Sequence, residues 1–163
     1  MRLRAAARDA NHYDITRDDR SVATVSLHGG GSGRVTLVDG GALLLRREGL
    51  FGARYTIFRD TPAASGETPP APLLRATRYN LLRRSYDIEM APHRVSLRAE
   101  SPWSGNYLLI VEGGAAGAIR HTAARSRDAS GAFPDELPQE AAIALLCLVL
   151  AIWRTGHARV DTL

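Results

Sequence analysis

Short apolar runs separated by polar and glycine-rich segments make up most of this chain. In residues 21–27, apolar side chains alternate with more polar ones, which is the period of two expected of a β-strand with one buried face. The peptide Asp39-Gly40-Gly41 stands between two such runs, residues 34–38 and 42–47. Because Asp-Gly between apolar runs is typical of a tight turn, these residues predict a β-hairpin.

A near-repeat in the middle of the chain extends this pattern. Each copy has a bulky apolar pair, a small or basic segment, and a tyrosine that opens an alternating strand. The three copies are residues 50–57, 81–88 and 102–109, and the strand-like runs before them are 43–47, 74–79 and 94–100. Since no helical pattern separates these runs, the repeat predicts a meandering antiparallel sheet and not a βαβ fold.

One helix is predicted, at residues 137–154, and its segment 141–153 is apolar on every side. Pro134 and Pro138 with nearby acidic residues are start signals, and Gly156 is a stop signal. The 13 apolar residues would rise about 20 Å, short of the roughly 30 Å hydrocarbon core of a bilayer. We therefore expect a helix enclosed by protein. The alternative is a tail-anchored membrane protein with 141–153 in lipid.

These patterns divide the chain into three parts. Residues 1–20 are polar and form either an N-terminal arm or a first strand, residues 21–155 form the main domain, and residues 156–163 form a C-terminal tail. Within the domain, the polar stretch 124–131 predicts a loop. The expected fold class is mostly β with one C-terminal helix: a closed antiparallel β-barrel of about twelve strands around a buried hydrophobic helix. Closure removes sheet edges, and its lumen would enclose a helix that has no polar face.

Three segments together resemble the tubby-like C-terminal superfamily, which includes the LURP-one-related proteins and the phospholipid scramblases. They are Leu-Leu-Arg-Arg-Glu-Gly-Leu-Phe-Gly-Ala-Arg-Tyr at 44–55, Leu-Leu-Arg-Arg-Ser-Tyr at 81–86, and Leu-Pro-Gln-Glu at 137–140 leading into the apolar helix. The resemblance is to a short bacterial member and covers residues 20–155. It implies a closed antiparallel barrel of about a dozen strands threaded by the helix. Within the superfamily, tubby binds phosphoinositides and scramblases are associated with membranes, but the fold alone does not transfer these properties to this chain. The headgroup site of tubby has no residue-by-residue match in this chain, and the cysteine-rich palmitoylation segment of scramblases is missing.

Composition and net charge restrict the possible functions only weakly. The 163 residues suit one domain, and the formal net charge of +4 comes from 21 basic residues that are all arginine. Arginine binds phosphate and carboxylate through a planar fork, which favours an anionic partner, whereas a GC-rich genome would give the same enrichment by codon bias. Cys147 is the single cysteine, which fits a reducing compartment. With no signal-peptide pattern at the N-terminus, we expect a cytoplasmic protein, peripheral to a membrane if it binds lipid.

The candidate binding residues are five arginines beside the repeated turns. If the copies are neighbours, these side chains gather on one rim: Arg46, Arg47, Arg54, Arg83 and Arg84. Aromatic side chains at the strand starts could stack on nucleic-acid bases, but their repeated position favours the core of the sheet, so nucleic acid is not the favoured partner. These are Phe51, Tyr55, Tyr86, Trp103 and Tyr107. The expected partner is an anionic phospholipid or another protein.

Other motifs point away from catalysis and metal binding. The glycine-rich stretch 29–33 lacks the Gly-Lys-Ser/Thr of a P-loop, and the five histidines are scattered without metal-ligand spacing. The acidic residues between Asp9 and Asp19 do not follow the calcium-loop spacing, and no Gly-x-Ser-x-Gly motif occurs. We therefore expect a non-enzymatic binding or scaffold domain without cofactor or metal. The alternative is an enzyme or small-molecule-binding protein with a pocket in the sheet.

Overall fold

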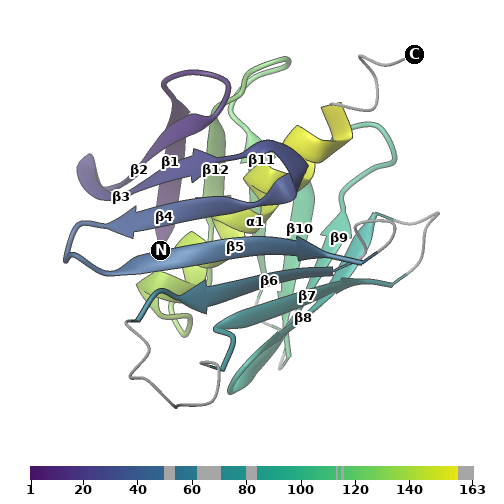
Figure 1. The fold of residues 1–163 in the computed structure, drawn as a ribbon. Helices are drawn as coiled ribbons and strands as arrows, with labels where there is room; N and C mark the ends of the chain where they lie inside the picture. Colours follow the sequence, from purple (N-terminus) through teal and green to yellow (C-terminus); the bar gives the residue numbers. More distant parts are fainter. Residues whose placement is uncertain (50–53, 62–70, 80–83, 113, 115, 158–163) are drawn as a thin grey trace.

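The described residues form twelve antiparallel strands that close into one barrel around a single helix in this computed structural model (Figure 1). The structure describes residues 1–49, 54–61, 71–79, 84–112, 114 and 116–157. The elements are β1 (Arg2–Ala7), β2 (His12–Arg17), β3 (Arg20–Leu27), the 3-10 turn η1 (Gly29–Gly31), β4 (Gly33–Leu37), β5 (Ala42–Glu48), β6 (Arg54–Arg59), β7 (Leu74–Arg78), β8 (Ser85–Met90), β9 (His93–Ala99), β10 (Tyr107–Val111), β11 (Ala116–His121), β12 (Ala129–Ala132) and α1 (Gln139–His157). The predicted fold class is confirmed.

The hairpins follow from local sequence. At the β2–β3 turn, Asp18 and Asp19 have φ of 50° and 61°, the left-handed conformation that tight hairpin turns need and that aspartate tolerates. At the predicted β4–β5 turn, Gly40 has φ of 95° and the Gly41 amide donates to the Asp39 carboxylate at 2.9 Å. Each strand pairs with its sequence neighbour, so the meander predicted from the repeat is confirmed.

Closure of the barrel depends on the two ends of the chain. Residues 1–20 contain two strands, β1 and β2, and β1 pairs with β12 as well as with β2. The prediction of a loop across 124–131 is wrong at its end, because β12 begins at Ala129. Its sequence Ala-Ser-Gly-Ala has little intrinsic strand preference. Ladders to β1 and β11 on both sides hold it extended, and no local pattern shows these long-range pairings.

Helix α1 fills the lumen of the barrel. Every residue from Ala141 to Trp153 is buried, the most exposed being Ile152 at 9%. An 18-residue window of this helix, Gln139–Gly156, is long and apolar enough by composition to cross a membrane, with a mean hydropathy of 1.4, and 72% of it is buried inside the barrel. A tail-anchored protein would have to withdraw this helix and leave the inner face of the strands without its core. The burial therefore agrees with the enclosed helix expected from the sequence.

The ends of α1 differ from the predicted 137–154. The helix begins at Gln139, and the first helical hydrogen bond runs from the Ala142 amide to the Pro138 carbonyl at 3.0 Å. Gly156 does not stop the helix, which continues to His157. The Thr155 hydroxyl donates to the carbonyls of Ala151 and Ile152, at 3.2 and 3.0 Å, and so satisfies acceptors of the last turns.

The two ends of the barrel hold opposite ends of α1. The helix enters after β12, crosses the lumen, and ends at the end of the barrel where β1, β3, β5, β7, β9 and β11 finish (Figure 1). We call this end of the barrel the mouth. The opposite end holds the first turn of α1 and the N-terminus, whose amino group bonds to the Phe133 carbonyl at 3.0 Å.

Candidate functional site

The structure divides the predicted arginine rim between the mouth and the outer wall. Arg46 and Arg54 are exposed on the outer wall, where Arg46 lies over the Phe58 ring at 5.7 Å and Arg54 stands opposite Glu48 in the ladder. Arg47 and Arg84 lie at the mouth, and Arg83 is outside the described residues. The reason is strand parity: Leu43 and Leu45 are buried, so Arg47 continues the inward face of β5 while Arg46 points outward.

A row of three buried tyrosines lines the inner wall just inside the mouth. The Tyr55 and Tyr86 ring centroids are 6.2 Å apart and those of Tyr86 and Tyr107 are 6.5 Å apart, both pairs in edge-to-face geometry. The Tyr55 hydroxyl bonds to the Thr155 hydroxyl of α1 at 3.1 Å. The core position predicted for these tyrosines is confirmed, and they place the last turn of α1 against the mouth.

The same prediction is wrong for Trp103 and lies outside the described residues for Phe51. Trp103 is 93% exposed. It belongs to the β9–β10 turn, and the inward–outward alternation that buries the tyrosines applies only within a strand.

Three arginines act on the tyrosine row. Burial raises the pKa of Tyr86, and the positive charges of Arg78, Arg47 and Arg84 act in the opposite direction. Burial also raises the pKa of Tyr107, again opposed by Arg84 and Arg78. We call Arg47, Arg78 and Arg84 the arginine cluster. Sequence reasoning missed Arg78, although Leu74 and Ala76 are buried at alternate positions of β7 and put Arg78 on the same inward face.

Arg47 is held in place by a glycine. A Cβ at Gly31 of η1 would lie 2.6 Å from the Arg47 Cδ and 3.0 Å from its Cβ, so only glycine leaves room for this side chain. The Arg47 Nε atom is buried, and within the part of the chain that the structure describes it has no hydrogen-bond partner. An unsatisfied buried donor costs about 1–3 kcal/mol, and more when it is charged. An anionic oxygen could bond to it only after the neighbouring side chains shift enough to admit the anion beside the guanidinium.

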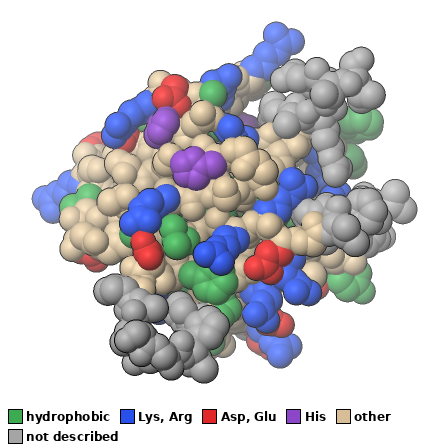
Figure 2. Space-filling view, in the orientation of Figure 1, with side chains coloured by type: hydrophobic (Ala, Val, Ile, Leu, Met, Phe, Trp, Pro, Cys, Tyr) green, Lys and Arg blue, Asp and Glu red, His purple; other side chains and the backbone are tan. Residues whose placement is uncertain are grey.

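Three carboxylates near the mouth are engaged by groups outside the arginine cluster. Asp14 pairs with Arg8, Glu100 pairs with Arg120 at 2.6 Å, and Asp9 contacts His12 at 2.9 Å. Among the described ion pairs, none includes Arg47 or Arg84. On the face seen in Figure 2, by contrast, arginines are spread over the surface with acidic side chains between several of them. Arg47 and Arg78 differ from this mixed surface because they continue the inward faces of β5 and β7, and the Nε of Arg47 is buried, whereas Arg84 is exposed at the mouth.

Several contacts fix the end of α1 beneath the mouth. The Trp153 indole donates to the Gly105 carbonyl at 2.6 Å and stacks on His121 with ring centroids 3.6 Å apart. The Arg154 guanidinium donates to the Ala10 carbonyl at 2.9 Å and to the Asn11 side chain. These contacts join the helix to two turns of the mouth, β1–β2 and β9–β10, and to the end of β11, so the last turn of α1 has a fixed position at the mouth.

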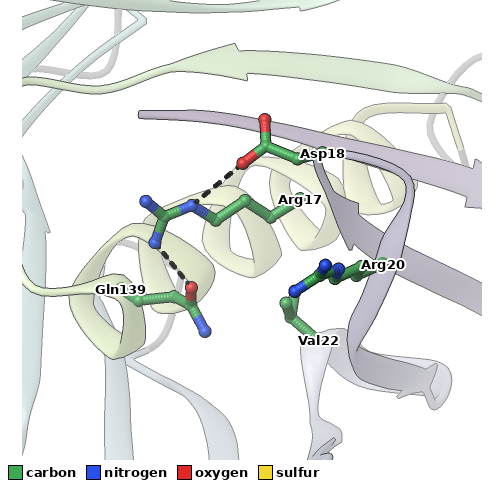
Figure 3. A pocket seen from close by; sticks show the side chains of 5 residues that line it. All are labelled: Arg17, Asp18, Arg20, Val22 and Gln139. Atoms are coloured by element: carbon green, nitrogen blue, oxygen red, sulfur yellow. Dashed lines mark hydrogen bonds and ion pairs between the residues drawn. The ribbon is translucent and has the colours of Figure 1, made fainter.

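An open cavity of about 510 Å³ lies at the opposite end of the barrel (Figure 3). Its lining residues are Arg17, Asp18, Arg20, Val22 and Gln139. Arg17 donates to the Gln139 amide oxygen at 2.9 Å, and its Nε lies 3.7 Å from the Asp18 carboxylate. Arg17 therefore ties the first turn of α1 to the β2–β3 turn. Because its guanidinium is engaged and an acid shares the cavity, the arginine cluster is the stronger candidate for binding an anion.

Within the described residues, no group of three or more His, Cys, Asp or Glu side chains is placed to hold a metal ion. Comparison of the chain with protein-family models, with curated proteins and with solved structures gave no match.

Proposed function

We propose that this protein is a non-enzymatic binding domain that takes an anionic phospholipid headgroup at the mouth of its barrel. The observation that carries the proposal is the arginine cluster, and above all the buried Nε of Arg47, which has no hydrogen-bond partner among the described residues. Guanidinium groups bind phosphate through paired N–H donors and are the residues of choice for partly buried phosphate contacts. In this role the protein is cytoplasmic and peripheral to the membrane.

The resemblance to the tubby-like superfamily supports the same reading at the level of architecture. A closed barrel around an apolar helix is what that resemblance implies, and membership of the superfamily is part of the proposal. A shared fold does not by itself assign a ligand. The proposal therefore depends on the arginine cluster at the mouth, and the test substitutes those arginines.

The test compares two pairs of arginines that remove equal charge. Arg47→Gln with Arg84→Gln removes two members of the arginine cluster, whereas Arg75→Gln with Arg94→Gln removes two exposed arginines of the outer wall at the starts of β7 and β9, away from the mouth. Each basic residue near an anionic membrane surface contributes about 1 kcal/mol to binding, so we expect the mouth variant to bind phosphatidylserine or phosphoinositide vesicles at least about tenfold more weakly. The outer-wall variant should bind within about twofold of the wild type.

Flotation of purified protein with neutral and anionic vesicles, at low and moderate salt, measures both effects. Binding should be confined to anionic vesicles and should weaken with salt. Equal losses in the two variants, or binding that ignores lipid charge, would contradict the proposal. Vesicle association that resists a salt wash and needs detergent for release would instead support the tail-anchored alternative.

A further inference from the structure

Two aromatic side chains project into solvent at the mouth. Trp103 lies in the β9–β10 turn and is 93% exposed, and Tyr79 directly follows β7 and is 74% exposed. The chain has one other tryptophan, Trp153, which is 8% exposed in the core. Since the turns after β7 and β9 both lie at the mouth, the two aromatic residues share one end of the barrel with the arginine cluster.

The position of Trp103 is defined by its turn. The Ser104 amide donates to the Ser101 hydroxyl at 3.0 Å, and the Asn106 amide donates to the Ser104 hydroxyl at 3.3 Å. The next residue, Gly105, accepts the hydrogen bond from the Trp153 indole. The turn is thus tied to α1, and it presents Trp103 outward from a fixed base.

The order of residues around the mouth favours a flat partner. Arg84 precedes β8, so it stands between Tyr79 at the end of β7 and Trp103 beyond β9. The strands β7 and β10 are three strand spacings apart, about 14 Å at 4.7–4.9 Å each. An extended surface can contact both aromatic residues and Arg84 together, whereas a small soluble anion cannot span the distance between the two aromatic residues. Tryptophan and tyrosine favour the interface between bilayer headgroups and hydrocarbon, where the ring is apolar and its N–H or O–H stays hydrated.

We infer that Trp103 and Tyr79 are interfacial anchors that enter the headgroup region of a bilayer while the arginine cluster holds an anionic headgroup. The inference rests on the proposed function for the arginine contacts and adds the partner, which is an intact bilayer surface. It also fixes an orientation, with the mouth against the membrane and the N-terminal end of α1 away from it.

Intrinsic fluorescence tests the position of Trp103. With phosphatidylserine vesicles, the wild-type emission should shift to shorter wavelength and should be quenched by lipids brominated on the acyl chain. In Trp103→Phe, only Trp153 emits, and its spectrum should not change on adding vesicles. Trp103→Ala with Tyr79→Ala should weaken vesicle binding about tenfold. The matched control is Val38→Ala, which alters a side chain that is 68% exposed at the opposite end and should leave binding unchanged.

The outcomes separate this inference from the proposed function. If the Arg47/Arg84 variant loses vesicle binding while the aromatic double variant keeps it and Trp103 emission does not shift, the inference is overturned and the headgroup site stands. If the wild-type protein does not bind anionic vesicles, both are overturned. A shift of Trp103 emission with single-stranded oligonucleotide but not with vesicles would also overturn the inference, in favour of base stacking.

Discussion

A single glycine determines where the key guanidinium lies. Gly31 has φ of 84°, in the left-handed region that favours glycine, and its Cα hydrogens face the Arg47 side chain. Arg47 thereby reaches the tyrosine row, where its charge acts on Tyr86. The glycine-rich stretch 29–33, which lacks the P-loop signature, contributes to the candidate site because Gly31 leaves room for an arginine.

We expect Gly31→Ala to destabilise the protein by about 1–3 kcal/mol and to weaken binding to anionic vesicles, because the new Cβ strains the backbone and displaces Arg47. The control is Gly29→Ala in the same turn, where an added Cβ would meet nothing within 4 Å and φ is outside the left-handed region. It should change stability by less than about 0.5 kcal/mol. Urea denaturation and vesicle flotation measure the two effects, and similar stabilities for the two variants would contradict this account of Arg47.

At the scale of elements, α1 supplies the core on which every strand depends. Four leucines of the helix are at most 1% exposed: Leu145, Leu146, Leu148 and Leu150. Fully burying one leucine contributes about 1.5–3 kcal/mol, so these four alone contribute about 6–12 kcal/mol. That is comparable with the whole net stability of an ordinary domain, about 5–15 kcal/mol. The barrel without its helix therefore has no adequate core.

A chain that ends at Asp135 is expected not to fold, because the inner faces of the strands would be left open to water. A chain that ends at His157 retains the entire helix and is the matched control, which should fold. Circular dichroism melting and size-exclusion chromatography distinguish the two. A truncated protein that stays monomeric and melts cooperatively would show that the strands form a core without α1.

At the scale of the whole molecule, the buried ionisable groups make the free energy of unfolding depend on pH in the alkaline range. Burial raises the pKa of Tyr13, Tyr86 and Tyr107, and it raises the pKa of the Cys147 thiol within α1. Above the ordinary pKa of cysteine, about 8.5, and then above that of tyrosine, about 10, the unfolded chain loses protons that the folded protein keeps. The stability that these groups contribute is therefore complete below about pH 8, and it falls as the pH rises through the two ordinary pKa values.

We expect the free energy of unfolding to fall above about pH 8.5 because of Cys147, and more steeply above about pH 10 because of the tyrosines, by up to about 1.4 kcal/mol per pH unit for each such group. Tyr107→Phe removes one of these groups and should make the loss smaller. Tyr79→Phe replaces an exposed tyrosine and should keep the loss seen in the wild type. Urea denaturation at pH 8 and pH 10.5 gives the comparison, and the same pH dependence in Tyr107→Phe and the wild type would contradict it.

The sequence predicted only part of the candidate site. Arg47 and Arg84 were predicted to gather, and they do lie at one mouth, but Arg46 and Arg54 were predicted with them and lie on the outer wall. Residues two positions apart in a strand share a face, so Arg47 lies on the inward face with Leu43 and Leu45, whereas Arg46 points outward. The same rule, applied from Leu74, would have found Arg78. Arg84 precedes β8, outside any strand, so its place beside Tyr107 depends on how the turn folds.

The sequence by itself determined the elements whose signals are local: the alternating strands, the Asp39-Gly40 hairpin, and a helix that must be enclosed because no face of it is polar. Only the tertiary structure decided that β1 and β12 close the barrel, that Arg78 joins Arg47 and Arg84, and that Trp103 is exposed while three tyrosines are buried. The reason is physical. Strand period and helix hydrophobicity depend on residues a few positions apart, whereas closure pairs residues more than 120 positions apart, and closure defines the inside, the outside and the mouth.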